Sequence, residues 1–169
     1  MSGERTPAPG DLAWVEALVN TLSVDTGEDR LAREFGLSGP ALAEATELRE
    51  GLRAACRAHA GHPVAPGALE DLNALLATAP LTVRIGPDGA ATLAPAAPAG
   101  EPTLLARVAS AVAGAAADGT WPRLKACAAP DCQWAYYDRS PAGRGRWCVM
   151  SVCGARAKMR TYRAAARTT

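Results

Sequence analysis

The sequence predicts an α+β fold in two parts, and three observations support that prediction. Apolar residues recur at helical intervals through most of residues 1–119. One alternating run, residues 81–85, precedes the turn Pro87-Asp88-Gly89 and predicts a single β-hairpin. Four of the five cysteines fall in the last quarter of the chain. We therefore expect a mostly helical domain over residues 1–119 and a small cysteine-bound module over residues 120–169.

The helices of the first part are predicted from apolar spacing and from residues that start or stop helices. Asp11, Pro40 and Pro102 stand at expected starts, whereas Gly36 and Gly119 stand at expected ends. Three prolines between residues 95 and 102 indicate a linker or a tight surface loop. The expected helices span residues 11–22, 28–36, 40–60, 68–77 and 102–117.

The spacing of the late cysteines is typical of a zinc site. Cys127 and Cys132 form one pair, Cys148 and Cys153 form another, and fifteen residues separate the pairs. Two short loops with two thiolates each can supply tetrahedral zinc, and four thiolates leave no open position, so the ion would be structural. Two disulfides, an iron-sulfur cluster and simple packing are the alternatives. Cys56 stands apart and is expected to be a small buried apolar residue.

The compartment bears on the disulfide alternative. The N-terminal residues contain no basic start followed by an apolar run, so no secretory signal is visible, and no run of residues is long enough to span a membrane. A reducing, cytoplasmic location is expected, which favours a metal over disulfides. An iron-sulfur cluster would use the same ligands and stays open.

The elements around the cysteines predict a treble-clef-like module. Residues 133–137 alternate as a strand of a hairpin that follows the first cysteine pair, and a turn rich in Gly and Arg leads back to Trp147 and Cys148. From Cys153 to about Arg167, only Gly154 interrupts an otherwise helical composition. The expected order is a knuckle, a hairpin and a helix around one zinc ion.

Charge divides the chain at the same boundary. Residues 121–169 carry ten Lys or Arg against two Asp, whereas residues 1–120 carry eight against fifteen acids. A cationic zinc module suggests a nucleic-acid partner, because phosphates supply the opposite charge. The alternative is that the two parts neutralise each other by docking.

The expected C-terminal helix arranges its arginines on one side. At 100° per residue, four arginines share a sector roughly 60° wide, and Ala155, Met159, Tyr162 and Ala166 form an adjoining face that is expected to pack. Arginine suits phosphate and guanine edges, although a solvated helix end is the plainer explanation. The candidate DNA contacts are Arg156, Lys158, Arg160, Arg163 and Arg167 of the helix and Arg139, Arg144 and Arg146 of the preceding turn.

Catalytic motifs are not apparent in the first part. We find no nucleophile elbow, phosphate-binding glycine loop or His-rich metal motif, so we do not expect an enzyme. Asn20 and Thr21 interrupt an apolar helix and could line a ligand pocket, or could end the helix through local hydrogen bonds. Two alternative functions stay open: a small-molecule enzyme in the first part, and an RNA- or protein-binding module that uses Trp134, Tyr136 and Tyr137.

These residues carry a resemblance to a known family. Cys127-Ala-Ala-Pro-Asp-Cys132, Asp138-Arg-Ser140, Trp147-Cys148 and Val152-Cys153-Gly-Ala-Arg156-Ala-Lys158 resemble the CGNR-type zinc finger at the C-terminus of bacterial proteins described as stress-induced transcription regulators. Leu18-Val-Asn-Thr21 resembles their N-terminal ABATE domain. The resemblance implies that the four cysteines bind zinc. Ala155 stands where the family has Asn.

Together the charge, the spacing and the resemblance predict a cytoplasmic transcription regulator. Residues 120–169 would bind duplex DNA, and residues 1–119 would sense a small-molecule effector, dimerise, or both. A homodimer is the economical expectation, because a single small finger reads few base pairs.

Overall fold

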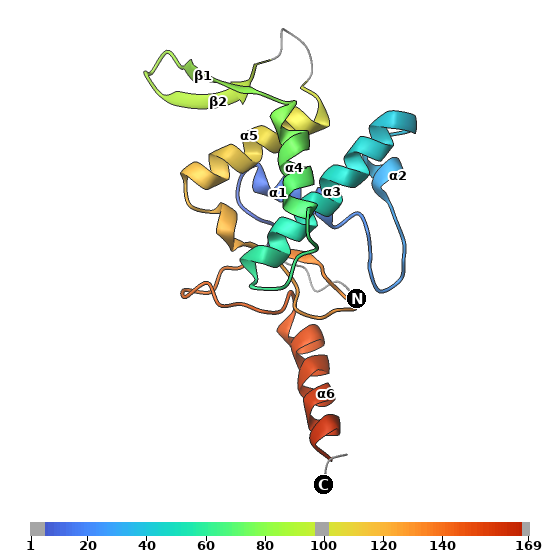
Figure 1. The fold of residues 1–169 in the computed structure, drawn as a ribbon. Coiled ribbons are helices and arrows are strands. Elements are labelled where there is room, and N and C mark those ends of the chain that lie inside the picture. The colour runs from blue at the N-terminus through green and yellow to red at the C-terminus, as the bar shows by residue number, and fades with distance from the viewer. Residues whose placement is uncertain (1–5, 97–101, 167–169) are drawn as a thin grey trace.

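The computed structural model describes residues 6–96 and 102–166, in a helical body from which a hairpin and a helix project in opposite directions (Figure 1). The helices are α1 (Leu12–Val19), α2 (Leu31–Phe35), α3 (Gly39–His59), α4 (Ala68–Ala77), α5 (Leu104–Ala117) and α6 (Ala155–Ala166). The strands are β1 (Leu81–Ile85), β2 (Ala91–Pro95), β3 (Leu124–Ala126) and β4 (Ala135–Tyr137). The α+β prediction is confirmed.

The core of the body lies where α1, α3 and α5 meet. Val15, Leu18 and Val19 of α1 are fully buried because apolar residues at helical spacing turn one face inward. Cys56 is buried in the same core, as expected, and burial raises the pKa of its thiol to about 12. Gly36 ends α2 in the left-handed conformation that the sequence predicted at this stop.

The first hairpin stands at the far end of the body from α6 (Figure 1). β1 and β2 pair antiparallel, with Val83 opposite Leu93 and Ile85 opposite Ala91. Thr103 caps α5 by accepting a hydrogen bond from the backbone N–H of Ala106, at 3.2 Å. The described part of the expected linker, residues 95, 96 and 102, joins this hairpin to α5, and residues 97–101 lie outside the described chain.

The second hairpin lies in the C-terminal part of the chain but packs into the core of the body. β3 pairs antiparallel with β4, so the first two cysteines lie in the loop that joins them, whereas the sequence predicted a hairpin that follows those cysteines. Leu124, Ala126 and Ala135 of this hairpin are fully buried in the same core as the body helices. The cysteine module is therefore built outward from the core of the body rather than tethered beside it.

The C-terminal helix projects from this module (Figure 1). A turn of π-helix, Met150–Gly154, leads into α6, and no described residue of α6 is buried. Met159 is 49% exposed and Tyr162 is 70% exposed. The prediction that this face packs is therefore wrong, because an amphipathic pattern does not reveal whether a partner is present. No helix in residues 6–96 or 102–166 combines the length and the apolar character needed to cross a bilayer.

Candidate metal centre and nucleic-acid interface

The four late cysteines converge on one point. The Sγ atoms of Cys127, Cys132, Cys148 and Cys153 all lie within 4.8 Å of one another, and two of the separations are 3.5 Å and 3.7 Å. Tetrahedral zinc with Zn–S bonds near 2.3 Å requires sulfurs about 3.8 Å apart. The donor set and its spacing therefore fit one structural zinc ion, as the sequence predicted.

Hydrogen bonds among the sulfurs favour a thiolate at Cys127. Hydrogen bonds from the thiols of Cys132 and Cys148, and from the backbone at Cys148 and Ala129, lower the pKa of Cys127. Donating these hydrogen bonds raises the pKa of Cys132 and Cys148, and burial and repulsion by neighbouring thiolates raise it further. A divalent cation removes that repulsion, since metal binding releases the thiol protons.

Two glycines hold the loops of the centre close together. A Cβ atom on Gly154 would lie 2.4 Å from Met150 Sδ and 3.2 Å from Trp147 Cδ1. A Cβ atom on Gly145 would lie 2.7 Å from Asp138 Oδ1. The signature glycine after Cys153 thus leaves room for the tryptophan that precedes Cys148.

A buried ion pair fixes the loop between β4 and Cys148. Asp138 is 3% exposed and accepts hydrogen bonds from Lys125 Nζ at 2.9 Å, from the Ser140 N–H at 3.0 Å and from the Gly145 N–H at 2.8 Å. Burial opposes ionisation of Asp138, but these donors outweigh it and hold its pKa below the ordinary value. Lys125 also donates to the carbonyl of Gly143, so the lysine closes the loop and is not a free cation.

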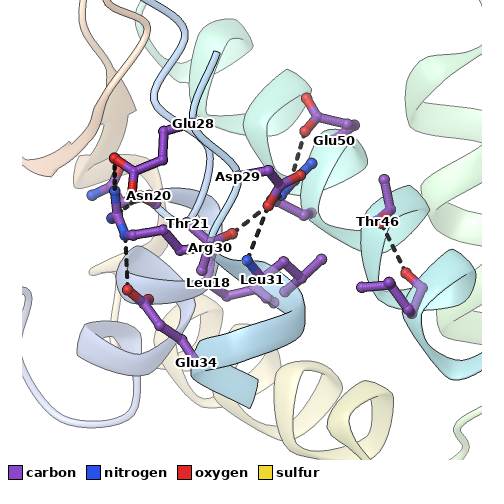
Figure 2. A network of polar contacts seen from close by, with 12 residues as sticks. Leu18, Asn20, Thr21, Glu28, Asp29, Arg30, Leu31, Glu34, Thr46 and Glu50 are labelled. Carbon is purple, nitrogen blue, oxygen red and sulfur yellow. Dashed lines mark hydrogen bonds and ion pairs between the residues drawn. The ribbon is translucent and has the colours of Figure 1, made fainter. Parts of the chain in front are cut away.

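Asn20 connects the body to the cysteine module. Its Nδ2 donates to the Ala135 carbonyl at 2.9 Å, and its Oδ1 accepts from the Ala135 N–H at 2.8 Å. The amide thus pairs with β4 as another strand would. Thr21 donates to the carbonyl of Leu18 and ends the helix locally, in the polar network around Asp29 (Figure 2). The structure does not support a ligand pocket at these two residues, because the protein itself uses their hydrogen-bonding groups.

Two further body residues, which the sequence did not single out, hold the module from α3. Arg53 is 4% exposed and donates to the Val19 carbonyl at 2.7 Å and to the Gln133 carbonyl at 3.2 Å. The His59 ring lies edge-on to Trp121, with Nδ1 donating to the Leu124 carbonyl at 2.8 Å. The sequence signal that could have indicated the role of Arg53 is its position one turn from Arg49, on the apolar side of an expected helix.

The predicted DNA-contacting residues fall into two groups. Arg156, Lys158, Arg160 and Arg163 are carried by α6 with largely exposed side chains, and Arg167 lies outside the described residues. Arg160 lies 4.0 Å from Asp131, which the sequence did not anticipate, but both side chains are about half exposed and the pair is weak. The helix therefore presents its positive charge to solvent.

The turn contributes unequally to the cationic surface. Arg144 and Arg146 are exposed, with Arg146 stacked on Trp147. Arg139 instead donates to the Pro7 carbonyl at 2.6 Å and stacks on Tyr137, so it joins the module to the N-terminal segment. Tyr136 is 6% exposed and donates to the Gly145 carbonyl, which removes it from the stacking surface considered for RNA.

Comparison with known families covers both parts of the chain. Residues 3–119 match the ABATE family, described as "Putative stress-induced transcription regulator", and residues 123–166 match the CGNR zinc finger. No curated protein matches the chain. One description names a regulator and the other a zinc finger, and neither names an enzyme. The chain belongs to the ABATE family and carries a CGNR zinc finger at its C-terminal end.

Proposed function

We propose that the protein binds duplex DNA through α6 and that the helical body regulates this binding in response to a small effector. The observation that carries the proposal is the solvent exposure of α6 together with its arginines. The helix projects from the base that holds the four cysteines (Figure 1), and none of its described residues is buried. It carries Arg156, Arg160 and Arg163 within one sector of its surface.

The base of α6 gives the helix a fixed direction. Cys153 is a metal ligand one residue before Gly154, and the helix begins at Ala155. A fixed first turn suits recognition, because its backbone loses little conformational entropy on binding. Ala155 is exposed at the first position of the helix, so the family's Asn at this position would also face outward.

Binding of a labelled duplex across a salt series tests the proposal. Affinity should fall steeply with salt, and Arg163→Gln and Arg156→Gln should each weaken binding similarly for all sequences and reduce the salt slope by about 1. Arg84→Gln is the matched control, because Arg84 is an exposed arginine on the far hairpin. No binding by the zinc-loaded protein at low salt would rule out this function.

The proposal includes a homodimer formed through the body, since two fingers would read a longer site than one. Sedimentation of the zinc-loaded protein with and without duplex measures this separately. A strictly monomeric protein that binds one duplex at a single half-site would contradict the dimer and leave the DNA contact intact.

A further inference from the structure

A cavity of about 510 Å³ lies between α1 and α5, away from the metal centre. Its volume falls within the range of small-molecule sites in proteins, roughly 300–1,000 Å³. We propose that this cavity binds a small aromatic carboxylate and is the effector site of the body, an inference that rests on the proposed regulatory function.

The carboxylate partner is Arg107. Its guanidinium carbon lies 4.8 Å from the centre of the Trp14 ring, and none of the ion pairs among the described residues involves Arg107. This cation–π contact places the guanidinium beside the indole, where its planar set of N–H donors can form two parallel hydrogen bonds with a ligand. A carboxylate matches that pair of donors.

Ser110 supplies a second polar group on the same side of α5. It lies three residues after Arg107, one turn along the helix, and both residues line the cavity. Its Oγ is buried and makes no hydrogen bond with the described protein. An unpaired buried hydroxyl is costly, and a single χ1 rotation would let it donate to a ligand without breaking an existing bond.

The remaining walls set the rest of the ligand's chemistry. Most of this surface is apolar and comes from Ala13, Trp14, Ala17 and Ala111. Such a surface favours a flat hydrocarbon group beside the indole. Asp11 also lines the cavity and is exposed. A second negative charge on the ligand would be repelled there, so a monocarboxylate fits better than a dicarboxylate.

Pro95 and Pro102 also line the cavity, and its two helical walls, α1 and α5, lead to the metal module. α1 ends at Asn20, whose amide pairs with Ala135 of β4. α5 is followed by Trp121, which packs on His59, and then by β3. A ligand that changes the separation of α1 and α5 would therefore act on both strands of the module.

Equilibrium dialysis of benzoate, with neutral benzamide as its near-isosteric partner, tests the site without DNA. Benzoate should bind saturably in the millimolar range, and benzamide should bind about tenfold or more weakly. Arg107→Gln should remove the preference for benzoate, Ser110→Ala should weaken both ligands, and Asp11→Asn should strengthen benzoate. Arg84→Gln should change nothing, because Arg84 lies outside the cavity.

The outcomes separate this inference from DNA binding. Equal affinity for benzoate and benzamide, unchanged benzoate affinity in Arg107→Gln, or no saturable benzoate binding would each overturn the site. These results hold whether or not the protein binds duplex. Where duplex binding is present, saturating benzoate should shift the duplex affinity of the wild-type protein and not of Arg107→Gln. An unshifted duplex affinity with benzoate bound would refute the effector role.

Discussion

Asn20 shows how one side chain can decide the position of a whole module. Its amide spans 115 residues of sequence and satisfies both backbone groups of Ala135 inside a buried interface. A substitution that removes the amide leaves a buried donor and a buried acceptor without partners, which costs more than the loss of an exposed hydrogen bond.

We expect Asn20→Ala to lower the free energy of unfolding by roughly 2–3 kcal/mol, because two buried backbone groups lose their partners. Urea denaturation of the zinc-loaded protein measures this. Asn73→Ala is the control, since Asn73 is exposed on α4 and its replacement should change stability by less than about 0.5 kcal/mol. Equal losses in the two variants would show that the amide does not support the interface.

His59 adds a pH dependence to the same interface. Desolvation by burial and the nearby Lys125 charge lower its pKa from 6.5, outweighing the opposing effect of the Leu124 carbonyl. Because the folded pKa is the lower one, the unfolded chain binds more protons below pH 6.5. The stabilising contribution of neutral His59 is therefore complete above pH 6.5 and is lost as the pH falls from that value through the lower folded pKa.

Between about pH 7.5 and about pH 5.5, the melting temperature of the wild-type protein should fall, and it should fall less in His59→Asn. Asparagine keeps a donor for the Leu124 carbonyl but does not titrate. Protonation of the metal ligands affects both proteins alike, so the difference between the two slopes reports His59. Identical slopes would contradict this assignment.

At the scale of elements, the approach of α3 to α4 depends on a missing side chain. A Cβ atom on Gly51 would lie 2.9 Å from Leu72 Cβ. Gly114, within α5, is exposed, and a Cβ atom there would meet nothing within 4 Å. The two glycines sit inside helices yet differ in whether the fold needs them.

Gly51→Ala should therefore destabilise the protein by about 1–3 kcal/mol through overpacking. Gly114→Ala should stabilise it by about 0.5–1 kcal/mol, because alanine loses less backbone entropy in a helix. Denaturant midpoints measure both changes, and opposite signs are the diagnostic result. Two changes of the same sign would mean that helix propensity, not the α3–α4 contact, dominates at Gly51.

Elements were more predictable from sequence than the contacts between them. α4 begins and ends where apolar spacing and Pro80 predicted, because the signals are local. The pairing of β3 with β4 was not predicted, since it joins strands on either side of the knuckle and depends on the buried faces of Leu124 and Ala135. The four zinc ligands were predictable because cysteine spacing is itself the chemical signal.

At the scale of the whole molecule, the core of the body adjoins a second, smaller cluster formed by Cys127, Ala129 and Cys153. Leu124 and Ala126 lead directly into Cys127, so the zinc site and the core are joined by one short strand. The docking of the module by Asn20, Arg53 and His59 escaped prediction, because each residue acts on a backbone group far away in sequence.

Loss of zinc should consequently weaken the entire fold and not the C-terminal end alone. Cys148→Ser should abolish binding of the one molar equivalent of zinc. It should also lower the melting temperature of the body helices, measured by circular dichroism. Cys56→Ala is the matched control, because Cys56 is a buried thiol outside the site and should leave the zinc content unchanged. Full zinc content in Cys148→Ser would refute the four-thiolate site.

The solvent exposure of α6 has a consequence for how the helix itself is maintained. Helices of about 12 residues are marginal in water when tertiary packing does not stabilise them, because nucleation is unfavourable. The π-turn at the metal nucleates the first turn of α6, while Tyr162 and Arg163 near its other end rely on propensity alone. The distal turns of α6 should therefore fray in the free protein and gain helix content when a polyanion neutralises the arginines. Ordering these turns would then reduce the net free energy of binding.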